Sequence, residues 1–87
     1  MAWTVEIERR AEKELGKLAK QDGKRIVAAM RAVAALENPR DRGKAMAGEW
    51  AGHWRYRIGD YRIIARIEDG RMVIVVVALG HRREVYR

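Results

Sequence analysis

The fold is decided by residues 54–79, which read WRYRIGDYRIIARIEDGRMVIVVVAL. Two dipeptides that suit two-residue hairpin turns interrupt this stretch, Gly-Asp at 59–60 and Asp-Gly at 69–70. The segments between them are rich in β-branched and aromatic residues, which favour strands. The pattern therefore predicts three antiparallel strands, at residues 54–58, 61–68 and 71–79.

Period-two alternation assigns the side chains of these strands to two faces. With two-residue turns, Ile58 faces Tyr61 and Glu68 faces Arg71. One face is almost entirely apolar and is expected to receive the helices: Trp54, Tyr56, Ile58, Tyr61, Ile63, Ala65, Ile67, Met72, Ile74, Val76 and Ala78. The other face is mixed: Arg55, Arg57, Arg62, Ile64, Arg66, Val73, Val75 and Val77.

Arginines dominate the first hairpin on that mixed face. The register sets Arg57 directly opposite Arg62, and like charges across a strand pair destabilise it by roughly 0.2–1 kcal/mol. Solvated arginines that keep a protein soluble are the simplest interpretation of one or two such residues. Four on one face predict an anion-binding surface instead. The valines beside them form an apolar strip that we expect a partner chain or stacked bases to cover.

The residues before the hairpins predict a strand and two helices. Trp3–Ile7 alternates like a strand, with Trp3, Val5 and Ile7 on one face. Helical spacing of apolar residues predicts helices over 8–19 and 22–36, the second capped by Asp22 and ended by Asn38-Pro39. Its buried side comprises Ile26, Met30, Val33 and Ala34. Residues 39–52 are predicted to form a loop. The expected fold is α+β, one domain over 1–87, in which an N-terminal strand and a two-helix hairpin pack on a small antiparallel sheet.

The composition limits the possible partners and sites. Nineteen Lys and Arg against 12 Asp and Glu give a net charge of +7, which favours a polyanionic partner. The chain has no Cys and no Ser, which excludes thiol catalysis, Cys-based zinc sites and a Ser-His-Asp triad. Two isolated histidines, His53 and His81, predict neither a metal site nor a cofactor. With no signal peptide and no apolar run long enough to span a bilayer, a cytoplasmic protein without membrane contact is expected.

Arg, Lys, Tyr and His suit one reaction, the cleavage of RNA by attack of its own 2′-OH on the adjacent phosphate. The substrate supplies the nucleophile, so the enzyme positions the phosphate and stabilises the added negative charge. Arginine binds phosphate well, but its guanidinium group stays protonated at neutral pH and so cannot accept a proton as a general base. The proton carriers near the C-terminus are His81 and Tyr86. Arg82 and Tyr86 lie four residues apart, which lets both reach one phosphate, although a frayed, solvated terminus fits the same spacing.

Two motifs, WRYRIGDYRI and GHRREVY, resemble the C-terminal half of the RelE toxins of the RelE/ParE toxin–antitoxin superfamily. The resemblance extends over nearly the whole chain. It implies a microbial-RNase-like fold and a metal-independent endoribonuclease that cleaves mRNA in the ribosomal A site. It also implies an inhibitory antitoxin, through which complexes of this kind often bind their operator DNA.

The resemblance implies functional roles for Arg55, Arg57, Arg62, Arg82 and Tyr86, to which we add the basic residues Lys44, His81 and Arg83 from this sequence itself. Arg57, Arg62, Arg82 and Tyr86 are the predicted catalytic set. The predicted RNA-binding set is Lys44, Arg55, Arg57, Arg62, His81 and Arg83. Well-known RelE toxins carry lysines where this chain has Arg55 and Arg57, so we assign both to phosphate binding rather than to proton transfer.

Two rival functions fit parts of the pattern. A ParE-like gyrase inhibitor would share the fold, but such toxins generally lack the arginine and tyrosine tail, and a supercoiling assay separates the two. A non-catalytic RNA-binding or ribosome-binding module would bind through the same basic face. Binding without cleavage, unaffected by Tyr86→Phe, would identify the latter.

Overall fold

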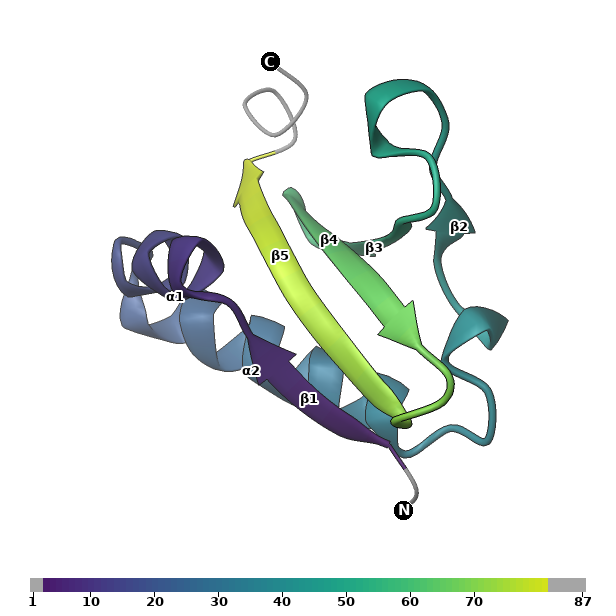
Figure 1. The fold of residues 1–87 in the computed structure, drawn as a ribbon. Coiled ribbons are helices and arrows are strands. Elements are labelled where there is room, and N and C mark those ends of the chain that lie inside the picture. The colour runs from purple at the N-terminus through teal and green to yellow at the C-terminus, as the bar shows by residue number, and fades with distance from the viewer. Residues whose placement is uncertain (1–2, 82–87) are drawn as a thin grey trace.

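The computed structural model describes residues 3–81, in which two helices pack on one face of a five-stranded sheet (Figure 1). The elements in chain order are β1 (Thr4–Ile7), α1 (Arg9–Gly16), α2 (Lys20–Ala34), η1 (Pro39–Asp41), β2 (Lys44–Ala45), η2 (Gly48–Trp50), β3 (Trp54–Ile58), β4 (Tyr61–Glu68) and β5 (Val73–His81). The strand order is β1-β5-β4-β3-β2, and every pair is antiparallel except β1 and β5. The predicted α+β class is confirmed, with a mixed sheet because the N-terminal strand joins its edge. Neither helix of this part of the chain is long and apolar enough to cross a membrane.

The first helix is shorter than the predicted 8–19, whereas the second has the predicted length but starts and ends two residues earlier than 22–36. The second begins at Lys20, and its N-cap is Ala19, so the prediction of Asp22 as the cap is wrong. Asp22 lies in the first turn, and its carboxylate accepts a hydrogen bond of 3.2 Å from the Tyr61 hydroxyl. The side chain that could cap the helix is therefore used to tie the helix to β4.

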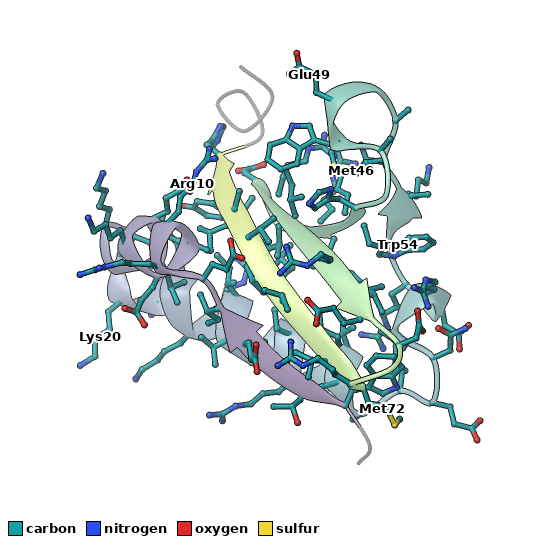
Figure 2. The ribbon with its side chains drawn as sticks, in the orientation of Figure 1. Arg10, Lys20, Met46, Glu49, Trp54 and Met72 are labelled. Atoms are coloured by element: carbon teal, nitrogen blue, oxygen red, sulfur yellow. The ribbon has the colours of Figure 1, made fainter. Side chains whose placement is uncertain are left out.

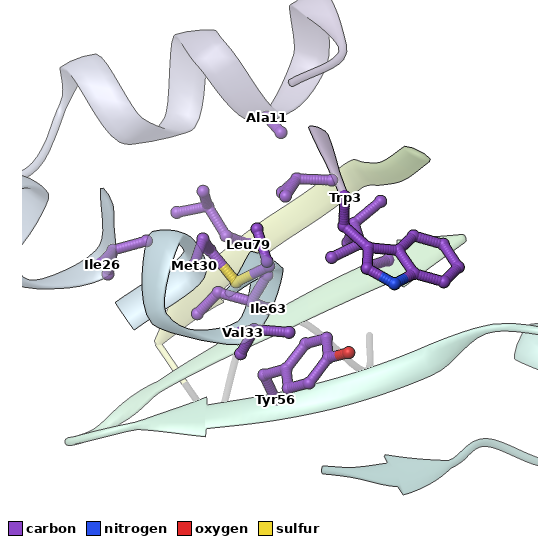
Figure 3. Packing of buried hydrophobic residues seen from close by; sticks show 12 residues of the cluster. Trp3, Ala11, Ile26, Met30, Val33, Tyr56, Ile63 and Leu79 are labelled. Atoms are coloured by element: carbon purple, nitrogen blue, oxygen red, sulfur yellow. The ribbon is translucent and has the colours of Figure 1, made fainter. Parts of the chain in front are cut away.

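The main core lies between the helices and the sheet (Figure 3). The predicted buried side of α2 is confirmed, because its apolar residues are all buried against the strands. Ile63 of β4 is completely buried at the centre of this layer. The core residues are Trp3, Ala11, Ile26, Met30, Val33, Ala34, Tyr56, Ile63, Ala65, Ile74, Val76 and Leu79. Ile7, which shares the parity of Trp3 and Val5, is instead 37% exposed.

The two hairpins differ in how well their turns were predicted. The first pairs Ile58 with Tyr61 across a two-residue turn, and Gly59 has the positive φ of 58° that such turns require. In the second, Glu68 pairs with Val73 rather than with Arg71, so residues 69–72 form a four-residue loop. Two backbone hydrogen bonds stabilise this loop: the Arg71 N–H donates to the Glu68 carbonyl oxygen, and the Met72 N–H donates to the Asp69 carbonyl oxygen. Met72, predicted to face the core, is exposed at the tip of the hairpin (Figure 2).

A β-bulge divides β5 into two halves with opposite side-chain alternation. Ala65 pairs with Val76 while Ile64 pairs with Ala78, so Val77 is an extra residue on β5. Beyond the bulge, Ala78 therefore lies on the open face and Leu79 packs in the helix-side core. The prediction of Ala78 on the helix side is wrong for this reason. Every later residue of β5 changes face with it.

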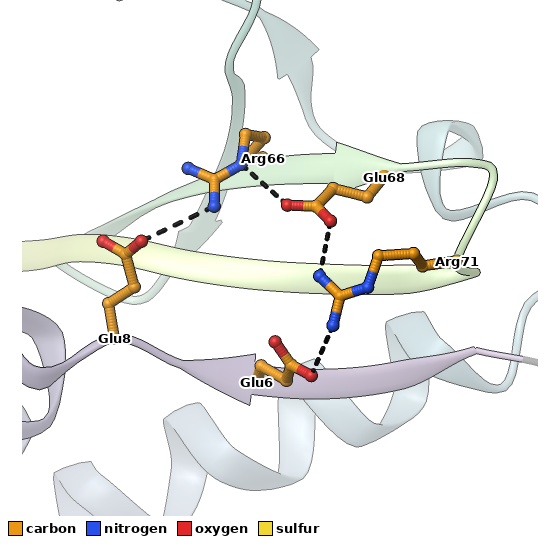
Figure 4. A network of polar contacts seen from close by, with 5 residues as sticks. All are labelled: Glu6, Glu8, Arg66, Glu68 and Arg71. Carbon is orange, nitrogen blue, oxygen red and sulfur yellow. Dashed lines mark hydrogen bonds and ion pairs between the residues drawn. The ribbon is translucent and has the colours of Figure 1, made fainter.

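A chain of ion pairs crosses the open face of β1, β5 and β4 (Figure 4). Arg71 binds Glu6 at 3.0 Å and Glu68 at 2.6 Å. Arg66 binds Glu68 at 2.9 Å and Glu8 at 3.5 Å. Arg66, predicted to belong to the anion-binding face, is therefore already surrounded by carboxylates.

Acid should weaken a second ion pair, which joins η1 to the β4–β5 turn. Arg40 donates to both carboxylate oxygens of Asp69, at 2.8 and 2.9 Å, and this lowers the pKa of Asp69 below its ordinary 3.8. A lowered carboxylate pKa stabilises the folded state above the ordinary pKa, and that contribution is lost as pH falls through the folded value. We therefore expect the free energy of unfolding to decline below a pH of about 4.

Urea denaturation at a series of acidic pH values measures this decline. In Arg40→Gln the slope should be shallower than in the unaltered protein. The matched control is Arg10→Gln, which removes an exposed arginine whose ion pair with Glu14 lies within α1. Equal slopes in the unaltered protein and Arg40→Gln would contradict the prediction.

Candidate nucleic-acid interface

Strands β2, β3 and β4 form a basic pocket on the open face of the sheet. Its volume is about 240 Å³, and its lining is Gly43, Lys44, Arg55, Arg57 and Arg62. Four cations thus surround one shallow hollow with no acidic residue in its lining. We call this hollow the basic pocket.

Strand pairing brings these four cations together. Arg57 pairs with Arg62 across the first hairpin, and Lys44 pairs with Arg55 across β2 and β3. Directly paired residues in an antiparallel sheet point to the same face, so both pairs project into the pocket. The prediction that residues 39–52 form only a loop is wrong, because this segment contains β2 and the two 3₁₀ turns η1 and η2.

Gly43 holds β2 against β3 at the edge of the basic pocket. Its φ is +77°, and a Cβ there would overlap the Arg55 carbonyl oxygen and lie 2.8 Å from Trp54 Nε1. Trp54 Nε1 donates a 2.6 Å hydrogen bond to the carbonyl oxygen of the neighbouring Arg42. Only glycine permits this close approach, so Gly43 fixes the position of Lys44.

Gly43→Ala should therefore loosen the basic pocket. We expect the free energy of unfolding to fall by about 1–3 kcal/mol, because the variant combines positive-φ strain with a backbone overlap. RNA affinity should fall as well, since Lys44 is displaced. Urea denaturation and fluorescence polarisation with a labelled oligoribonucleotide measure the two effects.

The control variant is Gly48→Ala. Gly48 also has a positive φ, of 66°, but a Cβ there would meet no atom within 4 Å. It isolates the cost of the backbone conformation from the cost of the overlap. Equal losses of stability and affinity in both variants would contradict a special role for Gly43.

The pocket can bind phosphate groups but offers little for proton transfer. Guanidinium groups donate forked hydrogen bonds that match phosphate oxygens. Tyr56, the tyrosine of β3, is buried on the helix side, donates at 2.7 Å to the Pro39 carbonyl oxygen, and has its pKa raised to about 12 by burial. Among residues 3–81, no group of three or more His, Asp or Glu side chains could hold a metal ion.

His81 lies on the other side of the sheet from the basic pocket. Its ring meets that of Tyr61 nearly at right angles, with centroids 6.1 Å apart. The two rings line a separate hollow of about 300 Å³ together with Glu14, Lys17 and Leu18. The bulge in β5 causes this, since unbroken alternation would place His81 on the face of Val73 and Val75. The structure thus separates His81 from Lys44 and the arginines.

The remaining predicted site residues are Arg82, Arg83 and Tyr86. All three lie outside the described residues. Their roles stay predictions.

The apolar strip on the open face is covered by the chain itself. Val73, Val75 and Val77 are buried, with Ile64 and Ala78, and Met46 and Trp50 pack against this cluster. The expectation that a partner chain or bases must cover the strip is therefore wrong. Met46 and Trp50 lie in a segment with no periodic pattern, so the sequence did not indicate that they cover the strip. It indicated only that the apolar strip needs a cover.

A histidine that the sequence pattern did not single out also lies on the open face. The Met46 N–H donates to the His53 carbonyl oxygen at 3.0 Å, which continues the β2–β3 ladder by one pair. The His53 ring meets the Trp50 ring edge-on, with centroids 5.3 Å apart. Its Nδ1 is buried and has no hydrogen-bond partner among the described residues.

Comparisons with known proteins agree on one family. A family model described as "ParE toxin of type II toxin-antitoxin system, parDE" matches residues 5–86. Toxin RelG of Mycobacterium tuberculosis is 33% identical over 90 residues, covering 100% of this chain and 99% of the relative. A chain of the RelBE2 toxin–antitoxin complex from M. tuberculosis superposes with a TM-score of 0.84 at 28% identity, over 95% of this chain and 94% of that one. A chain of the archaeal RelE–RelB complex from Pyrococcus horikoshii gives 0.75 at 26% identity, over 98% and 100%.

Proposed function

The chain belongs to the RelE/ParE superfamily of type II toxin–antitoxin toxins, and from this membership we propose that it is a ribosome-dependent endoribonuclease that cleaves mRNA in the A site. The observation that carries the proposal is the basic pocket, in which four cations converge. Arg57 directly opposite Arg62 opposes sheet stability, which favours a functional reason for the pair. A phosphate between them would relieve their repulsion.

The proposed reaction uses the RNA's own 2′-hydroxyl as the nucleophile. Arg57 and Arg62 hold the scissile phosphate, and Lys44 and Arg55 bind the neighbouring backbone. The 2′-oxygen forms a bond to phosphorus as the bond to the 5′-oxygen breaks, leaving a 2′,3′-cyclic phosphate and a 5′-hydroxyl. The stabilisation comes from fixed positive charge placed where negative charge develops.

The tail residues complete the proposed site. Arg82 stabilises the phosphorane or the leaving group, and Tyr86 orients or deprotonates the 2′-hydroxyl. Arg83 adds a further contact to the RNA. No metal or other cofactor takes part in this scheme.

We further propose that a cognate antitoxin inhibits the protein. The support is that similar solved toxins were crystallised as RelBE2 and RelE–RelB complexes. The antitoxin would wrap the toxin, and the complex would contact operator DNA through the antitoxin. The proposed substrate places the toxin's action in the cytoplasm, where mRNA is translated.

A reconstituted translation reaction tests the proposal. The purified protein is added to ribosomes stalled on a defined mRNA, and cuts are mapped by primer extension. We expect cleavage within the A-site codon, and none of the same mRNA without ribosomes. Intact A-site codons in the presence of folded protein would contradict the proposal.

The second candidate function is inhibition of DNA gyrase. It is favoured by one observation, the ParE description of the matching family model. A supercoiling assay with purified gyrase distinguishes it. Loss of supercoiling without mRNA cleavage would select this alternative.

A further inference from the structure

The basic pocket lacks a group that accepts a proton. Three of its cations are guanidiniums and the fourth is the ammonium of Lys44, and both types of charged group only donate hydrogen bonds. The proposed reaction must nevertheless remove the proton of the 2′-hydroxyl. A proton carrier is therefore expected on the open face, close to the phosphate.

His53 is the histidine of the described residues that the fold places on that face. Its backbone pairs with Met46. Because Met46 lies two positions after Lys44 and His53 two positions before Arg55, this pair and the pair of Lys44 and Arg55 share a face of the sheet. Met46 packs on the open-face cluster, and directly paired residues share a face. His53 thus lies on the same side as the basic pocket, immediately before β3 and two residues before Arg55.

The surroundings of the His53 ring hold it in one orientation. Trp50 of η2 contacts it edge-on, and the ring is only partly exposed. Its Nδ1 is enclosed without a hydrogen-bond partner within residues 3–81, an arrangement that buried polar atoms seldom show. Nε2 is then the ring nitrogen that can meet a substrate.

We propose that His53 is the proton carrier of the cleavage reaction, an inference that rests on the function proposed above. Nε2 takes the 2′-hydroxyl proton as the 2′-oxygen bonds to phosphorus. The bond to the 5′-oxygen breaks, and a water molecule protonates that leaving oxygen. The hydroxide so formed removes the proton from His53 and restores the neutral ring. Tyr86 is then left to orient the 2′-hydroxyl.

This assignment takes account of the charges near His53. The charged residues nearest to His53 in sequence or strand register are Lys44 on β2, Glu49 on η2, Arg55 on β3 and Arg66 on β4. Farther along β3 and β4 lie Arg57, Arg62 and Glu68. Arg66 already binds Glu8 and Glu68. His81, the other histidine, lies on the helix side with Tyr61 and cannot share the role.

The test measures single-turnover cleavage on programmed ribosomes as a function of pH. A histidine that takes the 2′-hydroxyl proton must itself be unprotonated, so the cleavage rate of the unaltered protein should fall as the pH is lowered, which gives the pH–rate profile an acidic limb. His53→Ala should cleave more slowly by a factor of roughly 10² or greater, and its pH–rate profile should lose this acidic limb. Free imidazole added to the buffer should enter the space beside Trp50 and restore cleavage. His53→Gln, which keeps most of the side-chain volume, should remain folded and inactive without rescue.

The matched control is His81→Gln. It removes the helix-side histidine and should keep the acidic limb. If the unaltered protein cuts no mRNA, the proposed function itself fails. If it cuts, and His53→Ala either keeps the acidic limb or is slow without imidazole rescue, the role of His53 is overturned while the function stands.

Discussion

Arg57→Gln is expected to slow A-site cleavage by roughly 10²–10³-fold while making the fold more stable. The loss follows because one preorganised cation that faces the developing charge is removed. The gain follows because Arg57 pairs directly with Arg62, and ending that repulsion should raise the free energy of unfolding by about 0.2–1 kcal/mol. Primer extension and urea denaturation measure the two effects on the same preparation.

The matched control for that variant is Arg31→Gln. Arg31 is an exposed residue of α2, the helix that packs on the side of the sheet away from the basic pocket. Arg31→Gln removes the same charge from the protein as Arg57→Gln, so any loss of cleavage caused by net charge alone should appear in both variants. A stabilised Arg57→Gln that cleaves at the normal rate would contradict the assignment of this pair to phosphate binding.

Arg82→Ala is expected to abolish detectable cleavage without altering the thermal unfolding midpoint. An arginine can donate two hydrogen bonds to the phosphorane or the leaving oxygen, and alanine can replace neither. Tyr86→Phe should reduce cleavage strongly, because it removes the hydroxyl that orients the 2′-OH. Single-turnover rates on programmed ribosomes measure both variants.

The control in the same segment is Arg87→Ala, which removes an equal charge from the last residue of the chain. It should cleave nearly as fast as the unaltered protein. If Arg87→Ala and Arg82→Ala lose activity equally, the tail acts through its overall charge and Arg82 has no specific role.

The hairpin of β3 and β4 shows why part of this fold could be predicted from the sequence. A Gly-Asp turn, alternation of period two and two flanking strands fix its register within a few neighbouring residues. The buried side of α2 was predictable for the same reason, since 3.6-residue periodicity is a local pattern. The pairing of Arg57 with Arg62 follows from the same local information.

The second hairpin shows where the local pattern was insufficient. Asp-Gly at 69–70 suits a two-residue turn, yet Arg71 and Met72 extend the loop and Arg71 binds carboxylates on two strands. Glu6 is one of these partners, and it is distant from Arg71 in sequence. The error of two residues left the faces of residues 73–77 unchanged, because side chains alternate with period two.

By itself, the sequence determined the strands of the hairpins, the buried side of α2 and the open-face arginines of β3 and β4. Tertiary structure alone decided that β2 pairs Lys44 with Arg55 and that β1 runs parallel to β5. It alone decided also that a bulge at Val77 moves His81 to the helix side while His53 stays on the open face. Periodicity and turn chemistry act between neighbours, so a single sequence displays them. A bulge or an added edge strand depends on the packing of segments far apart in the chain, and no local pattern records it.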